Sequence, residues 1–502
     1  MTVHSLVRAG AYSGLGSVLL MAANLSRDMA LAHTLGRSVA LDCFLLASMV
    51  PIFAVSVLTG AFRSIVVPMI ERLEAGGSGG VRLLAPLILK AALTTLLVTA
   101  LIAILFPVIS PLISGKLSKD AGQEIVRIGW ALLPMFAISG FASLADGPLQ
   151  TKGNYFYPLV ARSALPIGIA IAVLMCGPRF GIWAAIYGGT LGALLHLAIT
   201  RILVYRAWGL RQTPSRNSVV QSPPLLREYL YLCGGVSILY VSPLVDQTMA
   251  SMLGEGAVSA LGYASRISIG ISSLTIGLVA PALLPHFSRL AVGAERQKLR
   301  QHYLAATSAA IWCGFALAIG LWLFSEPGVV LLYERGKFDS NDSRAVAEVL
   351  RCIGLQFPFL LAGIVSANLI SALEKNRIFV PLNIANVVAN ILGNWSLMGP
   401  FGLNGIAIAT VITYALSMLT MLFVIQRMQN TALFATVMRH FIIAGSGAAA
   451  ILALGAYFDF TPSFNPSTYQ LGVSTACLTL FMVGAYAVNR SFFRQQSNPG
   501  QI

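Results

Sequence analysis

The sequence has few charged residues for its length. Only 10% of its 502 residues are Asp, Glu, Lys or Arg, whereas 57% are hydrophobic. A soluble domain carries about 25% charged residues, so this composition excludes a chain whose whole surface faces water. The net charge is +15, but the basic residues stand singly or in pairs between apolar segments, which argues against a nucleic-acid partner. We therefore expect membrane lipids to surround most of the chain.

The sequence also lacks the common motifs of enzymes. It contains no G-x-x-x-x-G-K-[ST] phosphate loop, no H-E-x-x-H and no C-x-x-C. Its six cysteines all lie in apolar stretches, where they act as small packing residues. These absences predict a protein that is not an enzyme, with no catalytic residues, no metal and no cofactor.

Long apolar segments dominate the remaining pattern. A transmembrane helix needs about twenty mostly apolar residues. Fourteen such segments fall near 9–33, 39–70, 83–112, 125–148, 156–176, 180–205, 228–253, 256–285, 303–333, 345–373, 378–398, 402–426, 437–457 and 467–489. The sequence therefore predicts an all-α polytopic membrane protein with about fourteen transmembrane helices.

The distribution of Lys and Arg predicts the orientation. Between the predicted spans, nineteen basic residues fall on the side that holds the N-terminus and seven on the other side. Cytoplasmic loops carry the excess of Lys and Arg. We expect a multi-pass protein of the bacterial inner membrane with both termini in the cytoplasm.

The first half of the chain resembles the second. Four short patterns recur in the same order, 217 to 223 residues apart. The matched pairs are Leu35-Gly36 with Leu253-Gly254, Gly60 and Pro68 with Gly277 and Pro285, Lys152 with Lys375, and Gly177-Pro178 with Gly399-Pro400. Six spans separate the copies, and because six is even the copies have the same orientation, as in a parallel repeat. This predicts two six-helix lobes, 1–210 and 211–430, followed by two extra helices and a tail in 431–502.

Several ionisable residues lie inside the predicted spans. Each costs about 2.5–3.5 kcal/mol at a membrane centre, so each is a candidate for function. They are Arg27, Asp28, Asp42, Arg63, Lys90, Asp246 and Arg266. Arg266 stands out because it lies about 15 Å into its span, among the small residues of "GYASRISIGISS".

Arginines in these positions suit a phosphate-bearing ligand. A guanidinium group makes bidentate, charge-assisted hydrogen bonds to phosphate. Arg27 and Arg266 come from opposite predicted lobes, and repeat transporters place their substrate near the midplane between such lobes. The structural alternative pairs Arg27 with Asp28 or Asp42, and Arg266 with Asp246. Asp146, Arg162 and His196 we interpret as structural residues.

Several segments resemble the MurJ (MviN) lipid II flippases of the multidrug/oligosaccharidyl-lipid/polysaccharide exporter superfamily. The most specific are "LGEGAVSALGYASR" at 253–266 and "LYERGKF" at 332–338. Arg27-Asp28 followed by Asp42, "GAFRSIVVP" at 60–68 and "LLPHFSRLA" at 283–291 extend the likeness over most of the first twelve spans.

The resemblance implies alternating access. The headgroup and diphosphate of an undecaprenyl-linked sugar would enter a cavity open to the cytoplasm, and rocking of the lobes would expose them outside. It carries over Arg27, Asp28, Asp42 and Arg266 as site residues, and we add Arg63, Asp246 and Ser265 as candidates for binding the lipid-linked glycan. Cell-wall or polysaccharide synthesis enzymes are candidate partners.

Some charges of the family are missing. Met21 stands where the family has an arginine, and Thr59, Ser265 and Ile269 stand where acidic residues are common. A relative that handles an exopolysaccharide unit in place of lipid II therefore fits as well. A cation-coupled exporter of small amphiphiles on the same fold and a membrane scaffold without transport activity remain as alternatives from other classes.

Overall fold

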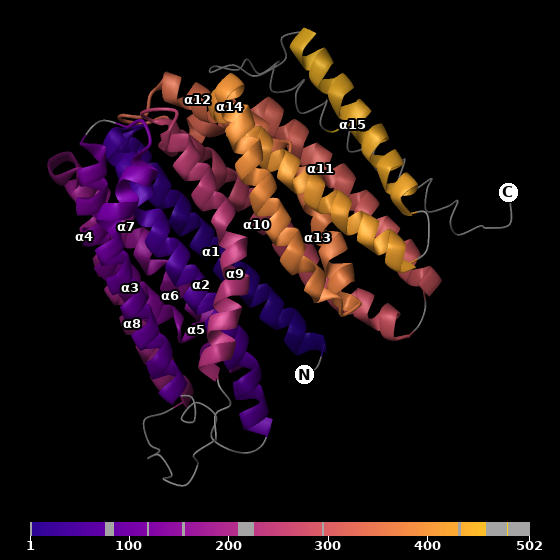
Figure 1. The fold of residues 1–502 in the computed structure, drawn as a ribbon, viewed down its shortest axis with the longest axis horizontal. Helices are drawn as coiled ribbons and strands as arrows, with labels where there is room; N and C mark the ends of the chain where they lie inside the picture. The colour runs from indigo at the N-terminus through magenta and orange to yellow at the C-terminus, as the bar shows by residue number, and fades with distance from the viewer. Residues whose placement is uncertain are drawn as a thin grey trace. The chain divides into compact units, whose positions relative to one another are not determined.

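The computed structural model describes residues 3–75, 85–117, 120–152, 156–208, 225–293, 296–429, 433–457 and 479. The elements are helices (Figure 1). In the first half these are α1 (Val3–Leu35), α2 (Val39–Ala75), α3 (Ala85–Ser114), α4 (Ala121–Ser143), α5 (Asp146–Thr151), α6 (Phe156–Arg162), α7 (Ala164–Phe180), α8 (Ile182–Trp208) and α9 (Leu225–Ser251). They continue with α10 (Ala257–Val292), α11 (Arg296–Tyr333), α12 (Ser340–Gly354), α13 (Phe357–Ala372), the 3₁₀ turn η1 (Asn376–Ile378), α14 (Phe379–Gln429) and α15 (Leu433–Tyr457).

The predicted all-helical membrane fold is confirmed. Thirteen of the fourteen predicted segments overlap these helices, and the last, 467–489, lies almost wholly outside the described residues. Within the part that the structure describes, eight helices are long and apolar enough to cross a membrane. The number becomes nine when α12 and α13, bent by 41° at their junction, count as one span.

Apolar side chains on the outside of α3 show why lipid must cover it. Leu97 is 70% exposed, Ile104 72% and Leu112 69%. Water around such a row would cost about 25 cal/mol for each Å² of apolar surface. The same helix buries Phe106 and Thr95 on its other side. An exposed apolar face and a packed inner face are what a helix at the lipid boundary requires.

The chain forms two compact units. Unit 1 comprises 1–259 and 335–339, and unit 2 comprises 260–334 and 340–502. These units follow packing, whereas the predicted lobes 1–210 and 211–430 follow the sequence repeat, so the lobe boundaries stay a prediction.

Unit 1 holds α1 to α9, and its helices pack closely where they carry small residues. Figure 1 shows α7 and α8 running along each other in this unit. A Cβ atom at Gly168 of α7 would lie 2.5 Å from the carbonyl oxygen of Gly188 in α8, and one at Gly192 would lie 2.5 Å from that of Ala164. Small residues at such an interface let two helix backbones approach, as is common in membranes.

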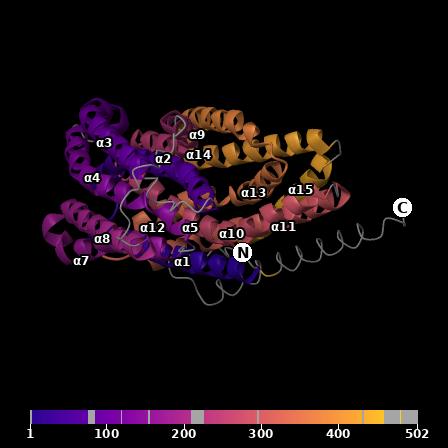
Figure 2. The same cartoon turned by 90° about the horizontal axis from the view of Figure 1, so that it is seen from below.

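Unit 2 is built around a cluster of buried hydrophobic residues. Tyr303, Trp312 and Ile319 of α11 pack with Leu369 of α13 and Leu422 of α14. Figure 2 shows α11 and α13 of this unit from a second direction. The hydroxyl groups of Tyr303 and Ser366, 3.0 Å apart, form a hydrogen bond inside the cluster. A buried hydroxyl needs such a partner, and this one joins α11 to α13.

The sequence repeat reappears in the backbone. Gly181 ends α7 with φ 55° and ψ −130°, and Gly402 interrupts α14 with φ 57° and ψ −134°. Gly36 and Gly254 also share a positive φ, at 60° and 109°. Residues with a Cβ atom rarely adopt these angles. Gly402 therefore divides α14 into two helices, close to the break that the sequence predicts between 378–398 and 402–426.

We expect Gly402→Ala to destabilise the protein by about 1–3 kcal/mol, the cost of holding a residue with a side chain in this region. Added atoms are not the cause, because a Cβ atom at this position meets nothing within 4 Å. Gly328 of α11 is the matched control, since it lies in a helix with equally open space around it. Thermal unfolding in detergent should show a lower Tm for Gly402→Ala and an unchanged or higher Tm for Gly328→Ala. Equal Tm values for the two variants would contradict the assigned conformation.

Candidate functional site

Arg27 and Asp28 form an ion pair in α1 of unit 1. The Nε and Nη2 atoms of Arg27 each lie 2.9 Å from Oδ1 of Asp28. The Asp28 side chain is 3% exposed and that of Arg27 is 19% exposed. The carboxylate therefore neutralises part of the arginine's charge and orients its guanidinium group. The sequence offered Asp28 and Asp42 as partners for Arg27, and this ion pair is with Asp28.

Asp42 caps a helix that lies more than two hundred residues further along the chain. Its Oδ2 accepts a hydrogen bond from the Gly256 N–H at 2.6 Å, and its Oδ1 accepts one from the Ser259 N–H at 2.8 Å. These donors stand at the start of α10, where the first N–H groups have no partner within the helix. Asp42 is fully buried, and a negative charge there also suits the helix dipole. A substrate-binding role for Asp42 stays a prediction.

The neighbouring Arg37 strengthens the same junction. Its Nε donates to the Gly256 carbonyl oxygen at 3.1 Å, so Arg37 and Asp42 together contact both polar groups of this glycine's backbone. Two backbone bonds add to this end of unit 1: Lys116 N–H to Ser251 O at 3.1 Å, and Lys337 N–H to His33 O at 2.9 Å. Several turns of unit 1 are thus joined by polar contacts at the ends of its helices.

The two segments that carried the family resemblance have structural roles. Tyr263 from "LGEGAVSALGYASR" and Tyr333 from "LYERGKF" are both buried in unit 2, with ring centroids 4.8 Å apart. Gly336 has φ 64°, and a Cβ atom there would clash with the carbonyl oxygen of His33 in unit 1. These residues of the two motifs stabilise the fold, so the motifs are stronger evidence for the fold than for the substrate.

Arg266 and Ser265 lie on α10 of unit 2, and both are half-buried. The helix is fixed close by, because the Gln356 side-chain amide donates to the Ser268 hydroxyl at 2.7 Å. Ile269, one turn beyond Arg266, is 62% exposed, which leaves this face of α10 partly open. A guanidinium group on such a face can bind an anion while the rest of the helix stays packed.

The other predicted residues lie in unit 1. Arg63 of α2 is exposed, and its Cγ lies 3.6 Å from where a Cβ atom of Gly147 would be. Asp246 of α9 is half-buried. The structure thus places Arg27, Asp28, Asp42, Arg63 and Asp246 in unit 1, and Ser265 and Arg266 in unit 2.

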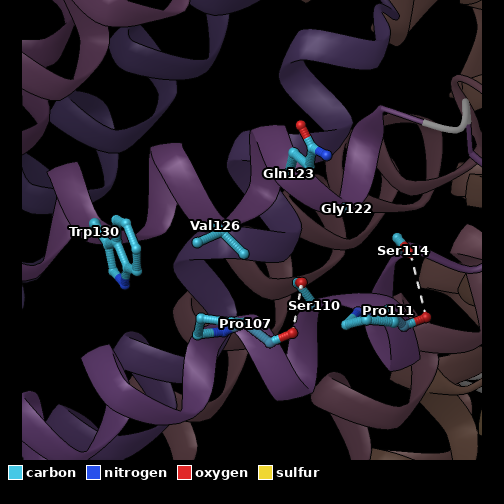
Figure 3. A pocket seen from close by; sticks show the side chains of 8 residues that line it. All are labelled: Pro107, Ser110, Pro111, Ser114, Gly122, Gln123, Val126 and Trp130. Carbon is cyan, nitrogen blue, oxygen red and sulfur yellow. Dashed lines mark hydrogen bonds between the residues drawn. The ribbon is translucent and has the colours of Figure 1, made fainter.

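A cavity of about 510 Å³ lies between α3 and α4 and contains none of these residues (Figure 3). Its lining includes Pro107 and Pro111 of α3 and Gly122, Gln123 and Trp130 of α4, with no charged side chain. The two prolines cannot donate helix hydrogen bonds, and the nearby Ser110 and Ser114 hydroxyls donate to their carbonyl oxygens at 3.4 and 3.3 Å. No side chain that lines this cavity carries a positive charge to neutralise a diphosphate.

Asp146, Arg162 and His196, which we interpreted from the sequence as structural residues, all lie in unit 1. Arg162 at the end of α6 donates from Nη2 to Oδ2 of Asp146 at the start of α5, and Asp146 is 1% exposed. His196 of α8 is also 1% exposed and lies within electrostatic range of Arg162. The only signal for this ion pair in the sequence is one acid and one base near the adjoining ends of two consecutive predicted spans. Unpaired surface charges produce the same pattern as often.

Comparisons with known proteins agree with this fold. The sequence model of the family "Lipid II flippase MurJ" matches residues 31–478. A probable lipid II flippase MurJ of Bdellovibrio bacteriovorus is 24% identical over 62% of this chain, and the match spans only 60% of that protein. The lipid II flippase MurJ of Burkholderia cenocepacia is 24% identical over 73% of this chain and 74% of its own.

Solved structures show the same fold. A structure of the lipid II flippase MurJ in an inward closed conformation matches with a TM-score of 0.77 at 20% identity, over 95% of this chain and 98% of that one. An inward-facing multidrug resistance MATE family transporter matches with a TM-score of 0.66 at 18% identity, over 82% of this chain and 95% of its own. The resemblance stated from the sequence is confirmed, and this multi-pass membrane protein belongs to the MurJ lipid II flippase family, which consists of transporters rather than enzymes.

Proposed function

We propose that this protein is a flippase that moves an undecaprenyl-diphosphate-linked glycan from the cytoplasmic to the periplasmic leaflet of a bacterial inner membrane. The observation that carries the proposal is the family match over residues 31–478. Lipid II is the first substrate to consider, because the relatives named above are lipid II flippases. The likeness to MATE transporters extends to the fold alone and supports no second function.

Two arginines are the groups proposed to bind the diphosphate. Arg27 in unit 1 is oriented by Asp28, and Arg266 in unit 2 lies on the partly open face of α10. Each guanidinium can donate two parallel hydrogen bonds to phosphate oxygens. Asp42, Arg63, Asp246 and Ser265 complete the proposed set. The polyprenyl chain would stay in lipid while alternating access moves the polar headgroup.

The orientation belongs to the same proposal. The excess of basic residues on one side of the predicted spans supports termini in the cytoplasm. The matched backbone angles of Gly181 and Gly402 support two lobes that arose from a parallel repeat. Two lobes of like orientation are a common design of transporters that alternate access.

The arginine that is missing at Met21 bears on the headgroup. The lipid II peptide brings carboxylates, and a site with fewer arginines balances them less well. We therefore predict that this chain restores growth poorly in a strain depleted of its own lipid II flippase. Colony growth is the measurement, with membrane abundance checked by blot and the strain's own flippase as the control. Full rescue at native expression would show that the missing arginine does not weaken the binding of lipid II.

A further inference from the structure

The cavity between α3 and α4 in unit 1 is a candidate binding site of its own (Figure 3). Its volume of about 510 Å³ lies within the range of about 300–1,000 Å³ found for small-molecule sites. Ser114 ends α3 and Gln123 lies in the first turn of α4, so one end of the cavity is at a membrane surface. Pro107 and Trp130 line it about 10–14 Å deeper, at 1.5 Å per residue along each helix. The cavity thus extends from the headgroup region into the hydrocarbon region.

An indole ring forms a fixed wall of this cavity. Pro107 has no N–H group, so the carbonyl oxygen of Ala103, four residues earlier, has no donor within the helix. Nε1 of Trp130 donates to that oxygen at 2.9 Å. The bond joins α4 to α3 and holds the ring in place, although Trp130 is 52% exposed. The wall is therefore preformed, and its polar atom is already used.

Other polar groups of the cavity have hydrogen-bonding capacity left. Pro111 deprives the Pro107 carbonyl oxygen of its helical donor, and the Ser110 hydroxyl reaches that oxygen at only 3.4 Å. The Ser114 hydroxyl donates to the Pro111 carbonyl oxygen at 3.3 Å. Both bonds, drawn in Figure 3, are longer than the usual 2.7–2.8 Å or so between two oxygens. The Pro107 carbonyl, the Ser114 hydroxyl and the exposed amide of Gln123 can therefore bind a polar ligand.

The charges around the cavity decide which ligand fits. In the described part of unit 1, no charged side chain lines it. Arg127 of α4 is turned toward α8, with its guanidinium carbon 5.0 Å from the centroid of the Trp183 ring and Nη1 4.0 Å from Glu124. Lys116 and Asp120, which are exposed beyond the end of the cavity, carry opposite charges. A charged group inside would have no partner, which is costly, so a neutral polar group fits best.

The polarity of the lining changes with depth. Ser114 and Gln123 lie at the membrane surface, whereas Pro107 lies deeper. On the same face of α3, within one turn of Pro107, Ile104 and Val108 are 72% and 67% exposed. A ligand with a neutral polar group at its outer end and apolar chains that continue into the bilayer matches this order.

We propose that this cavity binds the glycerol group of diacylglycerol, an uncharged lipid with one hydroxyl group and two ester carbonyls. The lipid hydroxyl donates to the Pro107 carbonyl oxygen, and the ester carbonyls accept from the Ser114 hydroxyl and the Gln123 amide. The acyl chains lie along Ile104 and Val108 of α3. The site goes beyond the proposed flippase activity, because it contains none of the residues proposed to bind the diphosphate and can be measured without transport.

The test is photo-cross-linking to the full-length protein in phosphatidylcholine bilayers. The probe is diacylglycerol with a diazirine near the start of one acyl chain, and peptide mass spectrometry locates the label, which we expect within residues 104–130. Unlabelled diacylglycerol should compete at least about tenfold better than phosphatidylglycerol, whose phosphate would be an unpaired charge in the cavity. Equal competition by the two lipids, or label spread evenly over the lipid-facing helices, would show general lipid contact only and overturn the proposal.

A variant that fills the cavity tests the same site. Gly122 lines the cavity, and a Cβ atom there would meet nothing closer than the Ser114 hydroxyl oxygen at 4.0 Å. Gly122→Leu should therefore keep the fold and lower the labelling of 104–130 at least about tenfold, because its side chain occupies the space of the ligand. Gly234→Leu in α9 is the matched control, since that glycine also faces open space, and it should label as wild type does.

Thermal unfolding in detergent checks that both variants are folded. Unchanged labelling of 104–130 in folded Gly122→Leu would overturn the proposal. If Gly122→Leu does not fold, the competition between diacylglycerol and phosphatidylglycerol on the wild-type protein decides.

Discussion

Arg266→Ala is expected to lower the rate of lipid-linked glycan translocation by about 10- to 100-fold, because charge-assisted hydrogen bonds worth about 1.5–3 kcal/mol are lost. The variant should reach the membrane at normal abundance, since its neighbours Ala264 and Ser268 remain packed and Ser268 keeps its bond to Gln356. Translocation by protein reconstituted in liposomes is the measurement. Arg266→Lys should recover only part of the rate, because an ammonium group is a point charge without the planar fork.

The matched control for this variant is Arg289→Ala. Arg289 lies on the same helix but is exposed near its end, where its Nε donates to the Pro285 carbonyl oxygen at a long 3.4 Å. Its loss should leave translocation unchanged. If Arg266→Ala translocates as fast as Arg289→Ala, Arg266 has a structural role and the proposed diphosphate contact is wrong.

Asp42→Ala should be the most destabilising of these substitutions, by about 2–5 kcal/mol, because two buried N–H groups lose their acceptor. Those groups are Gly256 N–H and Ser259 N–H at the start of α10. Asp42→Asn keeps one acceptor oxygen, so its Tm should fall between those of wild type and Asp42→Ala. The measurement is thermal unfolding of the purified protein in detergent.

The same pair of variants separates capping from substrate binding. If Asp42 acts only as a cap, folded Asp42→Asn translocates at the wild-type rate. A normal Tm with a large loss of translocation would place Asp42 in the substrate site. Equal Tm values for Asp42→Ala and wild type would contradict the capping role, since the two buried donors would then have other partners.

The helices could be predicted from the sequence because lipid imposes one simple requirement on each span. An apolar run of about twenty residues identifies α3 or α8 without reference to any other part of the chain. The break in α14 was also predictable, since Gly402 follows Pro400 in a repeated pattern. The short helices α5 and α6 were not, because their ends depend on packing within unit 1.

The roles of the embedded charges were harder to predict for a physical reason. An ionisable residue in a span needs a partner, but the sequence does not say whether that partner is a ligand or a distant backbone. Asp42 meets N–H groups from residues 256 and 259, a contact that folding alone creates. Asp146 likewise meets Arg162 only when α5 and α6 are brought together by folding. Arg27 was easier, since its partner is the next residue.

Translocation by the purified wild-type protein tests the central claim most directly. The chain is reconstituted in liposomes that carry a labelled undecaprenyl-diphosphate sugar in one leaflet, and an impermeant reagent reports how much headgroup reaches the other side. Lipid II and a diphosphate-linked sugar without peptide are compared in parallel. We expect the protein to move the diphosphate-linked sugars faster than protein-free liposomes do, and Arg266→Ala to move them far more slowly. Rates equal to those of protein-free liposomes for both substrates would contradict the proposed flippase function.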